Sequence, residues 1–285
     1  MMRKVFFIVF FIVFLTSCNL FFNRNYTAEY IEIFKGTSAW QIAKSVKKQD
    51  TIRIKKLLEE NPELITYREP KFGFSLVHWV MYNYEDTAYK QSPGYYGTAK
   101  LLIRYGANPF TLGYTKDLDN NYHCAMWDAS SGSNPLPYVK LCLSSKAYKE
   151  LTDEKRKRAL NESLIVLSGN QFYHKIDGVR LLIEQGANID YISHDGKNTP
   201  LSNALYFDNY KIVRYLIIDC GAKYKYSVSS EMSTEGISIY DLLNNDYTMN
   251  VKEGSEDYRI HKEVIKYIKS KENVDTLLIN LDTIH

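Results

Sequence analysis

A short sequence pattern recurs along the chain and constrains its fold more than any other feature. The pattern consists of three aliphatic residues, two variable residues and then Gly-Ala. It occurs in segments 101–108, 181–188 and 216–223. Segment 141–147 is a weaker copy, and spacings of 40, 40 and 35 residues separate the equivalent positions 106, 146, 186 and 221. A repeat of this length indicates a solenoid, in which each unit buries its apolar face against its neighbours.

Each copy predicts a helix that ends at the glycine. Val179, Leu182 and Ile183 lie at i, i+3 and i+4, so they form one apolar helical stripe. Gly186 follows the stripe at the point where a helix commonly ends in a left-handed residue. We therefore expect a positive φ at Gly106 and Gly186, where a Cβ atom would cost about 1 kcal/mol or more.

A shorter helix is predicted before each of these helices, because Ser75 and Thr199 precede apolar runs as capping residues. Pro200 stands at a first-turn position, where its missing N–H is not needed. The two patterns together resemble the ankyrin repeat, Gly-x-Thr-Pro-Leu-His-x-Ala, then a second helix and Leu-Leu-x-x-Gly-Ala-Asp/Asn, with a period of about 33 residues. This resemblance implies an all-α ankyrin-repeat solenoid of about six helix-turn-helix units with short hairpin loops.

Six units fit into residues 38–272, which we interpret as the ankyrin-repeat domain. They begin near residues 39, 73, 122, 161, 197 and 236, and the second, fourth and fifth units match the pattern best. Residues 18–37 contain Asn, Thr and aromatic residues without a helical period, and we interpret them as a tether. Residues 273–285 form a C-terminal tail to which we assign no structure.

The first eighteen residues predict export and lipidation. A basic start at residues 1–4 precedes an unbroken apolar run from Val5 to Leu15, which has the length of a signal-peptide core and is too short to span a bilayer. Residues 15–18, Leu-Thr-Ser-Cys, resemble the lipobox of bacterial lipoproteins. The resemblance implies that residues 1–17 are removed and that Cys18 is acylated, which holds the protein to the exported side of an outer or cytoplasmic membrane. The alternatives are an uncleaved hydrophobic anchor or a plain secretory signal.

Composition and motifs exclude several classes of function. The 36 Lys and Arg residues against 33 Asp and Glu leave a net charge of +3, and loss of Arg3 and Lys4 with the signal peptide leaves +1, so no nucleic-acid partner is expected. The sequence contains no Gly-rich phosphate loop, metalloprotease motif or nucleophile elbow. We therefore expect no catalytic residue, no cofactor and no metal.

The cysteines give no further chemistry. Three remain after Cys18, an odd number without CxxC spacing, which argues against a disulfide framework and a zinc site. One pair among the three could still form, and the sequence does not say which. The cysteines are Cys124, Cys142 and Cys220.

Aromatic residues are in excess, with 24 Tyr and 13 Phe. Several lie in or beside the loops between units, and in the ankyrin architecture those loops project toward the side where partners usually bind. Tyr is favoured at binding surfaces, because a rigid ring buries a large area at a small cost in entropy. The alternative is that the rings pack one loop against the next. The predicted partner-binding residues are Tyr114, Tyr191, Tyr224, Phe110 and Tyr122.

Two classes of function follow for a chain that we expect to be monomeric. The first is a non-enzymatic lipoprotein of the bacterial cell envelope, which binds a protein partner of unknown identity through its loop and concave surface. The alternative is an envelope enzyme or toxin-like effector, in which the repeats position a site near His123 and Cys124. Labelling of the cysteines and capture of the partner discriminate between the two classes.

Overall fold

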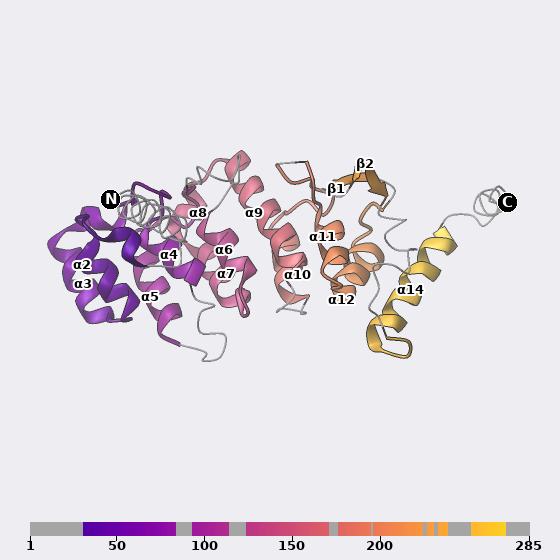
Figure 1. Ribbon diagram of the computed structural model, residues 1–285, viewed down its shortest axis with the longest axis horizontal. Helices are drawn as coiled ribbons and strands as arrows, with labels where there is room; N and C mark the ends of the chain where they lie inside the picture. The colour runs from indigo at the N-terminus through magenta and orange to yellow at the C-terminus, as the bar shows by residue number, and fades with distance from the viewer. Residues whose placement is uncertain are drawn as a thin grey trace, which may run out of the picture.

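Figure 1 shows the computed structural model, an elongated row of short helices that runs from the N-terminal end to the C-terminal end. The structure describes residues 31–83, 93–113, 124–170, 176–194, 196–224, 227–230, 233–238 and 252–271. Most helices occur in pairs joined by a turn, and a loop then leads to the next pair. Each pair corresponds to one unit of the sequence repeat.

Five helix pairs follow one another along the described chain, each with a first and a second helix. They are α2 (Trp40–Lys47) with α3 (Thr51–Glu60), α4 (Leu76–Asn83) with α5 (Pro93–Arg104), α6 (Ala125–Ser131) with α7 (Pro135–Ser144), α9 (Asp153–Ser168) with α10 (Asp177–Glu184), and α11 (Pro200–Tyr206) with α12 (Tyr210–Arg214). Helix α12 continues as the π-helix η4 (Tyr215–Asp219). The other elements are η1 (Ile31–Phe34), η2 (Pro62–Ile65), α8 (Lys146–Glu150), β1 (Ser227–Ser230), β2 (Ser233–Ser238) and α14 (Glu256–Lys271).

The paired helices form two layers. The first helices α4, α6, α9 and α11 contact one another in sequence, and the second helices α3, α5, α7 and α10 form the other layer. Contacts between neighbours are more extensive among the first helices than among the second. The first helices therefore make the larger part of the contact between successive units.

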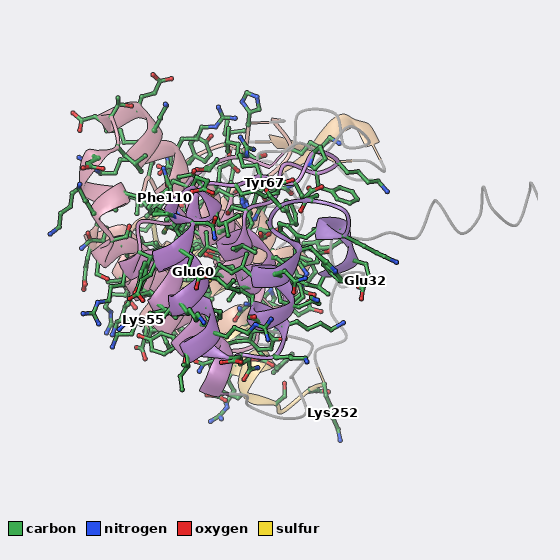
Figure 2. All side chains as sticks on the ribbon, turned by 90° about the vertical axis from the view of Figure 1, so that its left-hand side faces the viewer. Glu32, Lys55, Glu60, Tyr67, Phe110 and Lys252 are labelled. Atoms are coloured by element: carbon green, nitrogen blue, oxygen red, sulfur yellow. The ribbon has the colours of Figure 1, made fainter. Side chains whose placement is uncertain are left out.

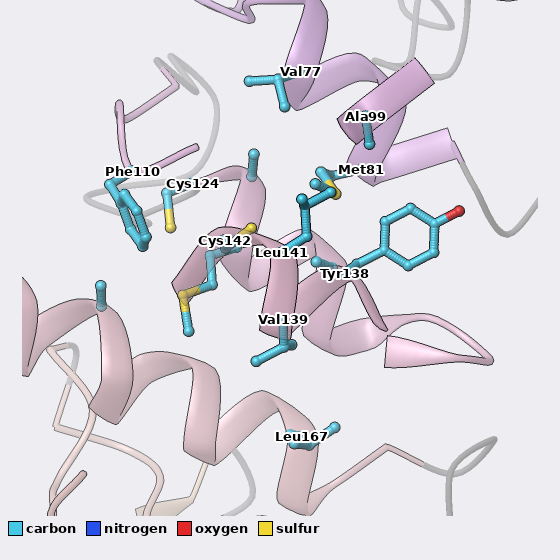
Figure 3. Close-up of a cluster of buried hydrophobic side chains, with 14 of the residues drawn as sticks. Val77, Met81, Ala99, Phe110, Cys124, Tyr138, Val139, Leu141, Cys142 and Leu167 are labelled. Carbon is cyan, nitrogen blue, oxygen red and sulfur yellow. The ribbon is translucent and has the colours of Figure 1, made fainter. Parts of the chain in front are cut away.

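The apolar stripes meet in a core that no single unit closes by itself. Figure 3 shows side chains from consecutive units in one cluster, with Met81 of α4 and Ala99 of α5 from one unit and Val139 of α7 from the following one. Leu167 of α9, in the next unit, lies beside them. The predicted stripe residues Val179 and Leu182 are fully buried in the same continuous core. Each unit thus depends on its neighbours for the burial of its apolar side chains.

The local signals for the starts and ends of the helices are confirmed. Gly106 and Gly186 have φ values of 98° and 95°, in the left-handed region that favours glycine. Thr199 and Ser202 form a capping box at the start of α11, in which each side-chain oxygen accepts the backbone N–H of the other residue at 3.0 and 2.8 Å. Pro200 occupies the first turn of the same helix.

Buried asparagines tie the turn of one unit to the unit before it. The side-chain amide of Asn170 donates to the carbonyl oxygens of Ser130 and Gly132 at 2.9 and 2.8 Å. The amide of Asn209, one unit further along, donates to the carbonyl oxygen of Ser168 at 3.2 Å. These bonds satisfy carbonyl groups at the ends of first helices, which have no partner within their own helix. They also fix the distance between successive units.

The structure adds two features to the expected organisation. Residues 31–34, within the segment interpreted as a tether, form η1, and Ile31 and Phe34 are buried in the core of the first unit. Residues 236–238, where the repeat pattern places the start of the sixth unit, lie in β2 instead of a helix. Strand β2 pairs antiparallel with β1, with Val228 opposite Ile237. Val228, Thr234 and Ile237 are of residue types that are enriched in strands.

Several sequence predictions fall outside the described residues. They concern the signal peptide 1–17, the acylated Cys18 and the C-terminal tail 273–285. The domain boundaries also stay predictions. Among the described residues, no helix combines the length and the apolar character that a membrane span requires.

Gly169 provides a test of the close packing between units. A Cβ atom at this position would lie 2.7 Å from Cδ2 of Phe207 and would also overlap the amide of Asn203, which donates to the Ile165 carbonyl at 2.7 Å. We expect Gly169→Ala to lower the free energy of unfolding by about 1–3 kcal/mol, because α11 must move away and strain this bond. Thermal and denaturant unfolding measure the effect.

The control for this prediction is Gly97→Ala in α5, where a Cβ atom would meet nothing within 4 Å. Alanine favours helix over glycine by about 1 kcal/mol, so this variant should be as stable as the parent or more stable. Equal stability of the Gly169→Ala variant and the parent would contradict the packing described here.

Candidate partner-binding surface

The array has two opposite edges. The loops between units lie along one of them, which we call the loop edge and define by the described residues of 66–75, 106–113, 186–199 and 221–238. The turns inside the units lie along the other, the turn edge, defined by residues 48–50, 132–134 and 207–209. Figure 1 shows α8 and the β1–β2 hairpin on the upper, loop edge. Of the predicted binding residues, Phe110, Tyr191 and Tyr224 belong to this edge.

Tyr191 is held in a fixed position by a buried carboxylate. Its hydroxyl donates to Oε1 of Glu162 at 2.8 Å, and the backbone N–H of His194 donates to the same oxygen at 3.2 Å. Glu162 lies on α9 and is only 8% exposed. The neighbouring Asn161 accepts the backbone N–H of Asn188 at 2.7 Å, so two adjacent residues of α9 hold the loop 188–194. The Tyr191 ring is half-buried and oriented by these bonds.

The next loop is joined to this one. The backbone N–H of Lys223 donates to Oδ1 of Asp190 at 2.8 Å, and the Lys223 ammonium lies 4.0 Å from the other carboxylate oxygen. Tyr224 follows directly and packs, partly buried, against the core. The structure therefore brings together the two loops that carry the predicted residues Tyr191 and Tyr224.

Ile192 is a candidate binding residue that the sequence analysis missed. It follows Tyr191 on the loop edge, and 51% of its surface is exposed. Few large apolar residues of the described chain are exposed, and the others, Ile52, Tyr206 and Phe207, belong to or adjoin the turns within units. The only sequence signal was an aliphatic residue in a polar loop, which is too common to single out a site.

For Phe110 the structure favours the packing alternative. The side chain is only 9% exposed, and its ring centroid lies 5.7 Å from that of Tyr148 on α8. Arg156 covers the same Tyr148 ring at 5.5 Å, in a cation–π contact. Phe110 therefore packs the loop 106–113 against α8 and offers little surface to a partner. The predicted residues Tyr114 and Tyr122 lie outside the described part of the chain.

Other loops on this edge are held as firmly. The Glu69 carboxylate is fully buried and accepts the backbone N–H groups of Lys71, Phe72 and Phe74 at 2.8, 2.6 and 3.1 Å. The Arg68 guanidinium donates to the carbonyl of Gly73 in its own loop and to a carbonyl of the following loop. Loops fixed in this way lose little conformational entropy when they bind a partner.

The alternative site near His123 and Cys124 lacks a reactive thiol. Burial raises the pKa of the Cys124 thiol to about 12, and it raises the pKa of Cys142 well above its ordinary value. Only the thiolate is a strong nucleophile or metal ligand, so these two groups stay protonated and inert near neutral pH. Both are free thiols buried in the core, and Cys220 is a free thiol that is partly exposed. His123 lies outside the described residues.

Metal ligation finds no support in the part of the chain that the structure describes. No group of three or more His, Cys, Asp or Glu side chains is arranged there to hold an ion.

Comparisons with known proteins identify the fold. The family model described as "Ankyrin repeats (many copies)" matches residues 169–217. A crystal structure of an ankyrin repeat protein is 17% identical to this chain, with a TM-score of 0.53 over 79% of this chain and 96% of the other. An ankyrin repeat domain from Acinetobacter baumannii is 18% identical, with the same TM-score and the same coverage. No curated protein matches the chain by sequence. The predicted all-helical ankyrin-repeat fold is confirmed, with the β1–β2 hairpin as an addition to it.

The state of the thiols is directly measurable. In the folded chain from Asn19 to His285 at pH 8, we expect a thiol reagent to label Cys220 and to leave Cys124 and Cys142 unmodified, because a pKa of about 12 leaves only about one thiolate in ten thousand at Cys124. Unfolding in denaturant should expose all three cysteines. Mass spectrometry identifies the labelled residues.

Cys220→Ser is the control for this measurement, because it should abolish labelling of the folded chain. Persistent, fast labelling of Cys124 in this variant would contradict the buried position and would support the enzymatic alternative.

Proposed function

We propose that this chain, an ankyrin-repeat domain by its fold, is a non-enzymatic lipoprotein of the bacterial cell envelope that binds a protein partner on its loop edge. Ankyrin-repeat domains are typically protein-binding and generally non-catalytic, which supports a non-enzymatic, protein-binding role. The proposal that the partner binds on the loop edge rests on the loop 188–194, where the half-buried Tyr191 lies next to the exposed Ile192.

The geometry of this loop suits a binding surface. The Glu162 carboxylate fixes the Tyr191 hydroxyl and the backbone of His194, so the loop needs no ordering on binding. An aromatic ring beside an exposed aliphatic side chain provides an apolar centre, and Asp190 and Lys223 provide a polar rim. A central apolar anchor surrounded by polar groups is the usual composition of a protein–protein interface. Tyr224 extends the surface along the edge.

The proposed location rests on the N-terminal sequence. The apolar run from Val5 to Leu15 and the Leu-Thr-Ser-Cys motif at residues 15–18 favour export, cleavage and acylation of Cys18. Acyl chains on this cysteine hold a protein to a membrane without a spanning helix. The partner would then be a protein exposed on the same side of that membrane.

The binding prediction uses a double variant of the loop edge. We expect Tyr191→Ala/Ile192→Ala to lower the affinity for a partner captured from envelope extract by about 2 kcal/mol or more, because both side chains lie at the centre of the proposed surface. The matched control is Tyr206→Ala, which removes an aromatic side chain of 77% exposure next to the opposite edge. Affinity and melting temperature are measured on the same preparations.

The two measurements separate binding from packing. If Tyr191 only packs its loop, the double variant should melt at a lower temperature while the folded fraction keeps the affinity of the parent. That result would refute the assignment of the loop edge, and so would an equal loss of affinity in the Tyr206→Ala control.

The anchor has its own prediction. Cys18→Ser should leave the precursor uncleaved or release the chain to the soluble fraction, because the atom that carries the lipid is gone. Incorporation of a radioactive fatty acid, followed by membrane fractionation, measures the effect. A variant that is labelled as strongly as the parent would show that acylation does not occur at this cysteine.

A further inference from the structure

The turn of the first unit carries an unusual concentration of positive charge. We call residues 44–56 the basic turn; they comprise the end of α2, the turn itself and the first half of α3. Six cationic side chains and one acidic side chain give this segment a net charge of +5, whereas the whole chain carries only +3. The cationic residues are Lys44, Lys47, Lys48, Arg53, Lys55 and Lys56, and the acidic residue is Asp50.

The basic turn also carries the most exposed large apolar side chain of the described residues. Ile52 lies in the first turn of α3 and is 84% exposed. Nothing in the fold requires an aliphatic residue there, because the core face of α3 consists of Ile54 and Leu58. An exposed aliphatic side chain among cationic groups is typical of surfaces that contact the headgroup region of a lipid bilayer.

Neighbouring carboxylates neutralise little of this charge. The Lys47 ammonium lies 3.7 Å from Oε1 of Glu32, and the two side chains are 53% and 39% exposed, so this pair is weak. Lys55 and Lys56 have only exposed partners one helical turn away, with ammonium-to-carboxylate distances of 3.8 Å, and such pairs are weak and screened. The charged side-chain groups of Lys48 and Arg53 form no ion pair with a carboxylate of the described residues. The Asp50 carboxylate is engaged as the cap of α3 and accepts the backbone N–H of Arg53 at 3.0 Å.

The charges on α3 are separated along the helix. Figure 2 views the array from its N-terminal end and shows Lys55 and Glu60 at different heights on the helix that faces the viewer. Glu59 and Glu60 occupy the end of α3 that leads to the loop edge, whereas Arg53 lies in its first turn, near the turn edge, and Lys55 and Lys56 lie in its middle. The positive potential is therefore concentrated at the turn edge of the first unit.

We propose that the basic turn rests on an anionic phospholipid surface, with Ile52 inserted among the headgroups. The inference rests on the proposed acylation of Cys18, which supplies the bilayer. Thirteen residues from Cys18 to Tyr30 precede η1, and such a segment spans at most about 45 Å. The first unit is therefore the part of the array that the anchor holds nearest to the membrane, and its turn edge has the charge that anionic lipids attract.

The remainder of the turn edge does not share this character. Near its C-terminal end, four exposed acidic residues lie beside three exposed basic residues, Lys211, Lys252 and Arg259, and Lys211 is paired with Glu256 at 3.0 Å. This end has no excess of positive charge to attract anionic lipids, so we place the contact at the first unit. The loop edge lies on the opposite side and stays accessible to a protein partner. The acidic residues are Asp208, Glu253, Glu256 and Asp257.

The test measures hydrogen exchange in the acylated full-length protein. The protein is reconstituted into vesicles of phosphatidylcholine alone and into vesicles that also contain phosphatidylglycerol. We expect backbone amides of peptides covering 47–56 to exchange about tenfold more slowly in the anionic vesicles than in the neutral vesicles, because headgroup contact excludes water and resists opening. High salt should remove the difference, since the screening length falls to about 3 Å at 1 M.

Three exposed residues provide the variants. Lys48→Glu/Arg53→Glu should abolish the difference between the vesicles, because it reverses two charges that have no carboxylate partner. Ile52→Ser should reduce the difference and leave its salt dependence in place. The matched control is Lys149→Glu/Lys155→Glu on α8 and α9, which makes the same change in charge at exposed positions away from the basic turn. This control should behave as the parent.

The outcomes distinguish this inference from the proposed anchor. A protein that stays in both kinds of vesicle, with equal exchange of the basic turn in each, overturns the inference and leaves the anchor standing. A protein that floats only with anionic vesicles, and loses this property in Lys48→Glu/Arg53→Glu, supports the inference and refutes the anchor. Slower exchange that grows with protein concentration in the absence of vesicles would assign the surface to a second copy of the chain and overturn the inference.

Discussion

The burial of each unit's apolar stripe by the adjacent units is the interaction on which the rest of the structure depends. Val179 and Leu182 of α10 are fully buried, yet the helix has only eight residues and cannot close a core alone. The cluster in Figure 3 draws its side chains from several successive units for the same reason. A continuous core of this kind makes the array elongated and gives it two edges with different roles.

Close approach of the units then decides which small and polar residues the chain requires. Gly169 leaves room for Asn203 and Phe207 of the next unit, and Asn170 bonds to carbonyl groups of the unit before it. The loops are also fixed to the helices, because Asn161 and Glu162 on α9 form hydrogen bonds with the loop that carries Tyr191. A surface that is fixed in advance binds without a large entropic cost, which is the physical basis of the function proposed for the loop edge.

The two edges suit two kinds of contact at once. The loop edge offers Tyr191 and Ile192 within a polar surround, which suits a protein, and the basic turn offers Ile52 within a cationic surround, which suits anionic lipid. Because loops and turns alternate along a helix pair, the two surfaces face in opposite directions. An anchored molecule of this shape could hold a partner away from the membrane on which its first unit rests.

The sequence by itself determined the repeat, the positive φ at Gly106 and Gly186 and the helix cap at Thr199, because spacing and local backbone chemistry dictate all of these. The repeat pattern placed the start of a helical unit at residue 236, and this was wrong, because residues 236–238 lie in strand β2. Only the tertiary structure decided which aromatic and apolar residues stay exposed. Phe110 is buried against Tyr148 while Ile192 is exposed, and neither follows from local sequence, because burial depends on neighbours that are distant along the chain.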